Sequence, residues 1–527
     1  MVNNVLFIVV VKKRFRGFVV DKGVGRLILL VVFLGLIISF TYISLATNLF
    51  SKLCGRYFEL NLIGSTELPC FSYLIFLGDI NGDKKSEIVF YVDIIENENK
   101  EILIFDASAI NRGPVAQINL SKYVDDVFMP FRFDDVNSDG ILDIIIVGRV
   151  SDKLIRILCL AGDTYTTLWS TELNVTNVLW FSSGSIDVNG DGIIDIIICN
   201  NGDVFAVNGF NGSLLWKGEE HIVLDRFRIL SGDVNGDGRL EIILISLNHI
   251  YALASSNGTI YWHYFYCRGP TVDVDSMRVT LHDINGDGCD EIIYAKKEYG
   301  VYCISAEDGR PKYLWLRTTP HYDPRKLKVV FERGKYLVII FDHRGINAFA
   351  AENGEIVWSR DISIYFGAIE DINDDGSMEI LGGENTTFYY LSAANGLTLH
   401  TYSPNTEYLL SKVPESENQY IETHGLKIHT KSKSKEFYVL WYYPMIYDLD
   451  NSGKKEVIVG VHIHKYGRAG NFILILSSRG WKLGDVCIDN GEAFIEDFKC
   501  FDIDGDGIPE IIVMLPCHLY MYKIEIK

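Results

Sequence analysis

Short runs of apolar residues alternate with polar turns along most of this chain, and the same order of runs recurs many times. In one such unit, an apolar stretch at 227–230 leads into an acidic loop, and the β-branched run EIILIS follows that loop. The run HIYALAS comes next, then an Asn-Gly turn, and the unit ends with GTIYWHY. Short apolar runs bounded by Gly, Asn and Asp are typical of antiparallel strands joined by hairpins. Each unit is therefore predicted to form four short strands.

The acidic loop marks the repeat, because nearly the same string occurs eight times. In chain order, the copies begin at Asp79, Asp135, Asp187, Asp233, Asp283, Asp371, Asp448 and Asp502. A ninth unit at 326–358 has the strands without the acidic loop and fills the longest gap. Spacings of about fifty residues are typical of propeller blades, and no unit shows a helical period of useful length. We predict an all-β propeller of eight to nine four-stranded blades, with nine from the repeat count.

The two ends of the repeat region predict how the ring closes. The last unit ends after its third strand, HLYMYKIEIK, while an apolar strand at 56–63 precedes the first acidic loop. Pairing of that strand with the last unit would complete the blade and remove two sheet edges. One unit is longer than the others because of a polar insertion at about 406–436. This insertion has two possible interpretations: it contacts a partner, or it is a segment without a role.

The acidic loop has the residue pattern of a calcium site. Its side chains at positions 1, 3 and 5 are Asp or Asn in most copies, position 6 is Gly, and position 9 is Asp or Glu. Calcium takes six to eight oxygen ligands, and a tight loop can direct these side chains and the carbonyl of position 7 at one point. In the third copy the ligands are predicted to be Asp187, Asn189, Asp191, the carbonyl of Ile193, and Asp195. Unlike in an EF-hand, the closing acid enters a strand, and magnesium fits less well because it demands octahedral geometry.

All eight loops supply candidate metal ligands. They are Asp79, Asn81, Asp83, Glu87, Asp135, Asn137, Asp139, Asp143, Asp187, Asn189, Asp191, Asp195, Asp233, Asn235, Asp237, Glu241, Asp283, Asn285, Asp287, Glu291, Asp371, Asn373, Asp375, Glu379, Asp448, Asp450, Ser452, Glu456, Asp502, Asp504, Asp506 and Glu510. The alternative is a metal-free turn, since Asp, Asn and Gly favour turns on their own. The acid at position 9 favours the metal site, because a turn does not need it. Weaker binding is expected where Lys84 replaces Gly and where Ser452 stands at position 5.

Composition and charge limit the kinds of partner that the chain can bind. The chain has 527 residues with a net charge of −20, and 25 of its acids lie at the candidate ligand positions. Eight divalent ions would bring that charge to about −4. Nucleic acid is excluded as a partner, because phosphate binding needs a basic surface. The ten cysteines show no zinc or redox motif. Cys54 with Cys70, and Cys487 with Cys500, are close enough in sequence to form disulfides outside the cell.

The chain begins with a candidate membrane segment. Residues 27–46 are an uncharged apolar run, and a helix of about twenty residues spans the hydrocarbon core. Six Lys and Arg residues against one Asp precede this run, which places segment 1–26 in the cytoplasm. We predict a single-pass protein with an anchor at 27–46, a linker at 47–55 and an extracellular propeller at 56–527. The alternative is a signal peptide cleaved after Ala46, which would leave the propeller secreted.

With these motifs in hand, the chain resembles the FG-GAP (VCBS-type) calcium-binding repeats of integrin α-chain propellers and related exported proteins. The loop strings carry this resemblance over about residues 56–527, and it implies calcium in the blade loops and a role in adhesion or cell-surface binding. The runs FAVNGFNGSLLW and NAFAAENGEIVW also resemble the PQQ-like repeats of quinoprotein propellers. In those repeats a Trp packs between blades, which implies a structural role for Trp216, Trp262, Trp315 and Trp358.

Two classes of function follow from these predictions. The first is a non-enzymatic, membrane-anchored propeller that binds several calcium ions, up to eight, and presents a surface to a protein or glycan. The second is an enzyme, either a quinoprotein-like dehydrogenase or a calcium-dependent propeller that acts on polysaccharides. The chain contains no G-x-S-x-G or HExxH motif, and no catalytic residue is assigned. We interpret His462 and His464, which share one strand face, as strand residues rather than ligands.

Overall fold

The structure is a computed structural model of the chain, and its repeat region forms a unit that begins at Phe58. It describes residues 58–69, 72–94, 99–176, 178, 181–200, 202–218, 222, 227–246, 249–265, 277–297, 300–305, 312–317, 323–413, 437–465, 468–489 and 494–526. The predicted anchor at 27–46 and its flanks at 1–26 and 47–55 lie outside these residues. Among the described residues, no helix has both the length and the apolar character needed to cross a membrane.

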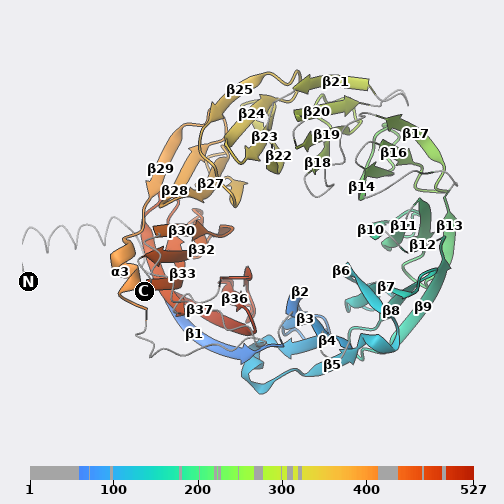
Figure 1. Ribbon diagram of the computed structural model, residues 1–527, viewed down its shortest axis with the longest axis horizontal. Helices are drawn as coiled ribbons and strands as arrows, with labels where there is room; N and C mark the ends of the chain where they lie inside the picture. The colour runs from blue at the N-terminus through green and yellow to red at the C-terminus, as the bar shows by residue number, and fades with distance from the viewer. Residues whose placement is uncertain are drawn as a thin grey trace, which may run out of the picture. The chain divides into compact units, whose positions relative to one another are not determined.

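The described residues form nine antiparallel sheets, which we number as blades I to IX (Figure 1). The first five are blade I, β2 (Ser72–Gly78), β3 (Glu87–Ile94), β4 (Asn99–Asp106) and β5 (Ala116–Asn119); blade II, β6 (Asp126–Asp134), β7 (Asp143–Ser151), β8 (Leu154–Leu160) and β9 (Thr167–Asn174); blade III, β10 (Phe181–Ile186), β11 (Asp195–Asn200), β12 (Asp203–Val207) and β13 (Leu214–Lys217); blade IV, β14 (Phe227–Gly232), β15 (Glu241–Ser246), β16 (His249–Leu253) and β17 (Ile260–Phe265); and blade V, β18 (Met277–His282), β19 (Glu291–Lys296), β20 (Gly300–Ser305) and β21 (Lys312–Arg317). The nine blades predicted from the repeat count are confirmed.

The remaining blades complete the ring. They are blade VI, β22 (Pro324–Glu332), β23 (Lys335–Asp342), β24 (Gly345–Ala350) and β25 (Ile356–Arg360); blade VII, β26 (Gly367–Glu370), β27 (Glu379–Glu384), β28 (Thr387–Ser392) and β29 (Thr398–Tyr402); blade VIII, β30 (Phe437–Trp441), β31 (Met445–Tyr447), β32 (Glu456–Lys465), β33 (Arg468–Leu476) and β34 (Lys482–Asp489); and blade IX, β35 (Asp497–Phe501), β36 (Glu510–Leu515), β37 (His518–Ile526) and β1 (Phe58–Glu67). Short helices are η1 (Ala107–Arg112), η2 (Leu120–Lys122) and α3 (Thr406–Leu410).

The ring closes as the chain ends predict. Strand β1 pairs antiparallel with β37, from Phe58 opposite Ile526 to Glu67 opposite His518. The N-terminal strand therefore supplies the fourth strand of blade IX, whose other three strands come from the C-terminal end. In every blade the strand nearest the centre lies at one edge of the sheet and the rim strand at the other (Figure 1). Pairing with β1 covers the edge that β37 would otherwise expose, and each blade of the closed ring packs between two neighbours.

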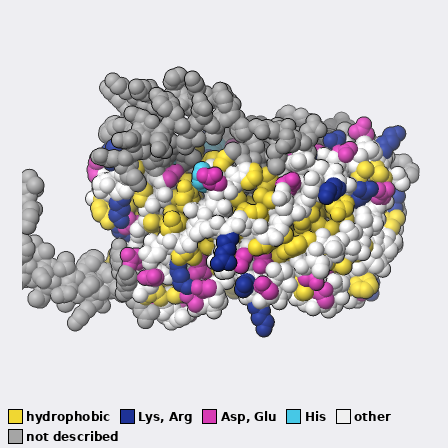
Figure 2. Space-filling view, turned by 90° about the horizontal axis from the view of Figure 1, so that it is seen from below, with side chains coloured by type: hydrophobic (Ala, Val, Ile, Leu, Met, Phe, Trp, Pro, Cys, Tyr) yellow, Lys and Arg dark blue, Asp and Glu magenta, His cyan; other side chains and the backbone are white. Residues whose placement is uncertain are grey.

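The cores lie between neighbouring blades, and this explains the continuous apolar runs. All six residues of β15, EIILIS, are buried, because each face of a middle strand packs on an adjacent blade. One core combines Cys199 and Val204 of blade III with Leu244 and Leu253 of blade IV. On the outside of the ring, hydrophobic, acidic and basic side chains are interspersed (Figure 2). The cores therefore hold each blade to the next one along the chain.

Tryptophans at the rim strands link consecutive blades, as the PQQ-like runs imply. Their indole N–H groups donate to carbonyls of the next blade, in the pairs Trp169–Gly209 at 3.1 Å, Trp216–Ser255 at 2.8 Å, Trp315–Ala351 at 2.6 Å and Trp358–Ala393 at 2.9 Å. Each ring also packs on a glycine of positive φ in the same turn, namely Gly212, Gly258, Gly354 and Gly396, where a Cβ would lie 2.4 to 2.6 Å from the ring. The structural role of these tryptophans is confirmed at Trp216, Trp315 and Trp358.

Blade VIII departs most from the repeat, and two predictions there need correction. The predicted insertion loop at 406–436 begins with helix α3, because Asn405 caps its N-terminus and Leu409 and Leu410 are buried; residues 414–436 lie outside the described residues. The predicted Cys487–Cys500 disulfide is wrong, because both thiols are free and lie in different blades. Cys517 is disulfide-bonded instead, and Cys54 and Cys70 lie outside the described residues.

Candidate metal centres

Seven of the acidic loops connect the innermost strand of a blade to the next strand, and the loop of blade VIII connects β31 to β32. The backbones of all eight loops are held in one conformation by their own side chains. In every loop the position 1 aspartate accepts a hydrogen bond from the N–H of position 6, at 2.8 to 3.0 Å. In seven loops the position 5 aspartate accepts from the N–H of position 7. These bonds fix the side chains of positions 1 and 5 against the backbone of the turn.

Position 6 explains why glycine recurs in the loops. Its φ is positive in all eight copies, from 80° to 88° at the seven glycines and 69° at Lys84. A side chain in this left-handed region costs about 1–2 kcal/mol, whereas glycine adopts it freely. Lys84 nevertheless keeps its N–H bond to Asp79 at 2.8 Å. The first loop therefore has the same geometry as the others, with backbone strain at one residue.

The position 9 acid starts the second strand and is buried in every loop. The exposed fraction of these eight side chains lies between 0% and 6%. One carboxylate oxygen of each accepts a hydrogen bond from the N–H of position 2, at 2.9 to 3.2 Å. The sequence argument that a turn does not need this acid is therefore wrong, because the carboxylate ties the two strands together across the loop. The position 9 acid therefore has a structural role that does not require a metal.

The burial of these acids raises their pKa values. Loss of solvent, followed by the charges of nearby loop aspartates, raises the pKa of Glu87, Glu241, Glu379 and Glu456 to about 7. The same causes raise the pKa of Asp143 to about 6. Backbone N–H groups lower these pKa values in part, but they do not compensate for the burial. A divalent cation would stabilise the charged form at each loop, because opposite charge nearby favours ionisation.

Several oxygens at the loops lack partners or converge, which tests whether the residues fit a metal ion. The Oδ1 atom of Asn373, a predicted ligand at position 3, is buried without a hydrogen-bond partner. Carboxylate oxygens of Asp448, Asp450 and Glu456 lie within 4.8 Å of one another. The weaker binding expected from Ser452 at this loop stays a prediction. An oxygen-only donor set with one unsatisfied ligand fits calcium chemistry.

A residue of the third strand, which the sequence analysis did not consider, also faces each loop. It lies opposite the position 9 acid: Asp106 is paired with Glu87 in blade I, and Ser392 with Glu379 in blade VII. Asp106 adds negative charge, and it raises the pKa of Glu87 after burial and the loop aspartates. In blade IX this position is Lys523, whose ammonium contacts Asp504, Asp506 and Glu510. Aligning third strands on the acidic loops would have revealed this position from sequence.

A second cluster of interest lies on strand β22 of blade VI and on the segments just before β26 of blade VII and β31 of blade VIII. We call it the wall cluster, and it consists of Arg325, Lys326, Tyr365, Phe366 and Tyr443. The Arg325 guanidinium lies 4.4 Å from the ring centre of Tyr365, and the Lys326 ammonium 5.2 Å from that of Tyr443. Phe366 contacts both tyrosines, at 4.5 and 4.8 Å between ring centres. Tyr365 is 58% exposed and Tyr443 44%, and neither cation forms an ion pair with a described acidic side chain.

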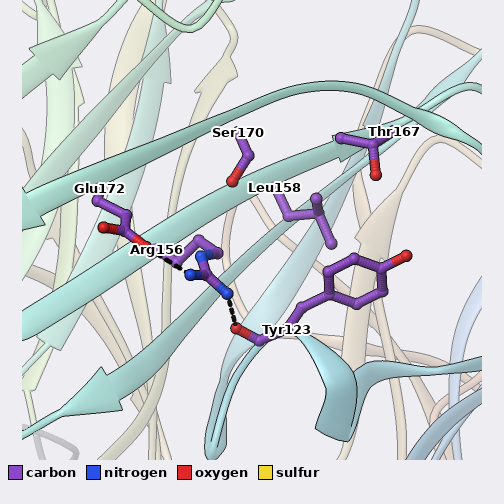
Figure 3. Close-up of a pocket in the computed structure, with 6 residues that line it drawn as sticks. All are labelled: Tyr123, Arg156, Leu158, Thr167, Ser170 and Glu172. Carbon is purple, nitrogen blue, oxygen red and sulfur yellow. Dashed lines mark hydrogen bonds and ion pairs between the residues drawn. The ribbon is translucent and has the colours of Figure 1, made fainter.

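A shallow groove lies at blade II, between η2 and strands β8 and β9 (Figure 3). It has a volume of about 410 Å³ and is lined by Tyr123, Arg156, Leu158, Thr167, Ser170 and Glu172. Arg156 crosses it, and its guanidinium bonds to the Glu172 carboxylate and to the carbonyl of Tyr123. Because its one cation is held by these partners, the groove offers little to a charged ligand.

His462 and His464 lie on strand β32, where the sequence analysis interpreted them as strand residues. His462 is 2% exposed, and its Nδ1 atom is 2.9 Å from the Oδ1 atom of Asn471. His464 stacks on Tyr438, with 5.0 Å between ring centres. Burial lowers the pKa of His462, which keeps its ring neutral. Both side chains are therefore part of the packing of blade VIII.

Taken together, the fold and the loops define a nine-bladed β-propeller with eight acidic strand-to-strand loops. No protein-family model matches the sequence, and no curated protein matches it. The resemblance to FG-GAP and PQQ-like repeats is therefore not confirmed by these comparisons.

Solved structures of several different proteins are similar to this chain. They include the C-terminal WD40 domain of Sif2 (13% identity, 76% of this chain and 99% of that chain, TM-score 0.38), the V. cholerae biofilm matrix protein Bap1 (13%, 86% and 96%, TM-score 0.28) and the dihydro-heme d1 dehydrogenase NirN in complex with DHE (10%, 82% and 79%, TM-score 0.38). The blade count given above comes from the strand pairing of this chain and not from these likenesses.

Proposed function

We propose that this chain is a membrane-anchored, extracellular propeller whose loops bind calcium and which presents a binding surface without catalysing a reaction. The observation that supports this proposal most is the common geometry of the eight loops. Each loop holds a buried acid at position 9 that accepts a hydrogen bond from the N–H of position 2. Buried carboxylates close to like charges are costly unless a cation balances them.

Calcium suits these loops better than other common ions. The candidate ligands are carboxylate, amide and carbonyl oxygens, and no Cys or His belongs to the loop pattern. A donor set of oxygens from one short loop favours calcium, which tolerates irregular geometry and six to eight ligands. The ions would neutralise most of the excess negative charge of the chain. We therefore assign them a scaffolding role, in which they strengthen the connection between the first two strands of each blade.

The wall cluster supports an acidic glycan as the ligand. Tyr365 and Tyr443 are exposed tyrosines, and a tyrosine ring suits a sugar because it has an apolar body and a polar tip. Arg325 and Lys326 supply cations on strand β22 without a described carboxylate partner, and guanidinium groups favour carboxylates. The chain has a net charge of −20, so most of its surface repels anions. A basic and aromatic surface without acidic partners is therefore the place where an anionic ligand would bind.

The metal part of the proposal is tested by isothermal titration of the full-length, chelator-treated protein with Ca²⁺ and, separately, with Mg²⁺. Calcium is expected to bind at several sites with dissociation constants at or below about a millimolar, the range of extracellular modules. Magnesium is expected to bind more weakly. Absence of calcium binding at millimolar concentration would contradict the proposal.

The glycan part is tested with purified polysaccharides that differ in charge. The full-length protein in calcium is titrated with a polyuronate and with neutral dextran, and Tyr365→Ala is compared with Tyr261→Ala. Tyr261 is a matched control, because it is 47% exposed on the rim strand of blade IV. Polyuronate binding is expected to weaken about tenfold or more in Tyr365→Ala alone, since stacking and charge act at one place. Equal affinity of both variants, or no preference for the polyuronate, would contradict a glycan site at the wall cluster and leave a protein ligand to be sought.

A further inference from the structure

The acidic loop of blade IX contains a cation of its own. Lys523 projects from β37, and its ammonium lies 3.0 Å from an oxygen of Asp506 and 3.8 Å from one of Glu510. It also bonds to Asp504. These three acids occupy positions 5, 9 and 3 of the loop, which are the positions of candidate calcium ligands. The ammonium therefore lies among the oxygens that a calcium ion would use.

The strand register shows that this arrangement is particular to blade IX. Lys523 lies opposite Glu510, one place beyond the pair Ile511–Tyr522. In blades I to V, VII and VIII, the residues in the matching place are Asp106, Ala161, Asn208, Ala254, Ser305, Ser392 and Ser477. None of these carries a positive charge. Only the loop of blade IX therefore has a cationic side chain at this place of the register.

The two cations exclude one another on geometric and electrostatic grounds. Calcium needs its oxygen ligands at about 2.3 to 2.6 Å, and an ammonium at hydrogen-bond distance from Asp504 and Asp506 occupies the place from which a calcium ion would contact them. The loop of blade IX has four acids at its ligand positions, and every other loop has three. The additional acid is Asp504 at position 3, and the Lys523 ammonium bonds to it.

We propose that Lys523 is the resident cation of blade IX and replaces calcium there, while the other seven loops take calcium. This inference rests on the proposed calcium binding. Blade IX is the blade that closes the ring, since Lys523 itself lies opposite Asn61 of β1. A covalently attached cation keeps the closing blade together when calcium is absent. Closure of the ring is thereby made independent of the metal that strengthens the other blades.

The test is the number of calcium ions bound by three full-length proteins, counted by native mass spectrometry. The proteins are the wild type, Lys523→Ser, which copies the residue of blades V, VII and VIII, and Ser392→Lys, which places an ammonium opposite Glu379. We expect one more ion in Lys523→Ser than in the wild type, and one fewer in Ser392→Lys. The shift of the unfolding temperature between chelator and calcium is expected to be larger for Lys523→Ser than for the wild type.

The outcomes separate this inference from the proposed function. Calcium bound by the wild type with an unchanged count in Lys523→Ser would overturn the role of Lys523 and leave the calcium function standing. If the wild type binds no calcium, the proposed calcium function is overturned. In that case, one calcium ion bound by Lys523→Ser would support the role of Lys523, and no ion bound by this variant would overturn that role as well. If Lys523→Ser does not fold, the count of Ser392→Lys decides, and an unchanged count overturns the exclusion.

Discussion

Replacing Gly354 by alanine tests how the blades are held to one another. This glycine has a φ of 69°, and a Cβ there would lie 2.4 Å from Cε3 of Trp315, the tryptophan of the preceding blade. The left-handed backbone costs about 1–2 kcal/mol with any L side chain. Overpacking against the indole adds about 1–3 kcal/mol. The lower entropy of the unfolded alanine chain returns about 0.4–1 kcal/mol. We expect a loss of roughly 2–4 kcal/mol in the free energy of unfolding.

Gly334→Ala is the matched control for this prediction. Gly334 lies in the same blade at a φ of 81°, and nothing lies within 4 Å of its added Cβ. The control therefore carries the backbone cost without the clash, and it is expected to lose only about 1 kcal/mol. Equilibrium urea unfolding, followed by tryptophan fluorescence, measures both variants. Trp315→Phe combined with Gly354→Ala is expected to lose less than the sum of the single changes, because the smaller ring relieves the overlap. Equal losses in the two glycine variants would refute Trp docking as the source of the effect.

Three further predictions concern the loops. Lys84→Gly is expected to raise the free energy of unfolding by about 1 kcal/mol, because Lys84 has a φ of 69° at a glycine position; an unchanged melting temperature would show that the strain is absent. Glu456→Gln keeps an acceptor for the Leu449 N–H but removes a buried charge beside Asp448 and Asp450. Native mass spectrometry is expected to show one calcium ion fewer, and the melting temperature in chelator is expected not to fall. An unchanged ion count would argue against Glu456 as a calcium ligand. Burial raises the pKa values of Glu87, Glu241 and Glu379 to about 7, so in chelator their protonated forms stabilise the fold; this stabilisation is full below the unfolded pKa and is lost as the pH rises through 7. Because calcium binds the charged forms, the gain in melting temperature from calcium is expected to grow between about pH 5 and 8. A gain that shrinks as the pH rises would contradict this linkage.

The strand pattern predicted the fold well, because each blade repeats the same order of short apolar strands and polar turns. The runs between 227 and 265 became the four strands of blade IV, and the unpaired third strand at the C-terminus predicted the pairing of β1 with β37. The unit at 326–358 became blade VI despite lacking an acidic loop. Hairpins and buried middle strands depend on neighbouring residues and on simple alternation, which a sequence displays directly.

The candidate sites depended more on contacts between distant residues, and here the sequence was less informative. The hydrogen bond from position 2 to the position 9 acid, Ile80 to Glu87 in blade I, gives that acid a structural role that its spacing did not suggest. Lys523 lies 13 residues beyond Glu510 and meets it only through strand pairing. The wall cluster joins residues of three blades, so no local motif marks it. Anchoring at 27–46, calcium binding and the enzyme alternatives stay predictions.

Thermal unfolding of the full-length protein in millimolar calcium and in excess chelator tests the central claim most directly. Each site that binds calcium in the folded state alone stabilises the fold by about 2.7 kcal/mol when the free ion is at a hundredfold excess over its dissociation constant. Several such sites are expected to raise the unfolding temperature markedly, and magnesium at the same concentration is expected to raise it much less. An unfolding temperature that is the same in calcium and in chelator would contradict the account, because the loops would then be acidic turns without a metal.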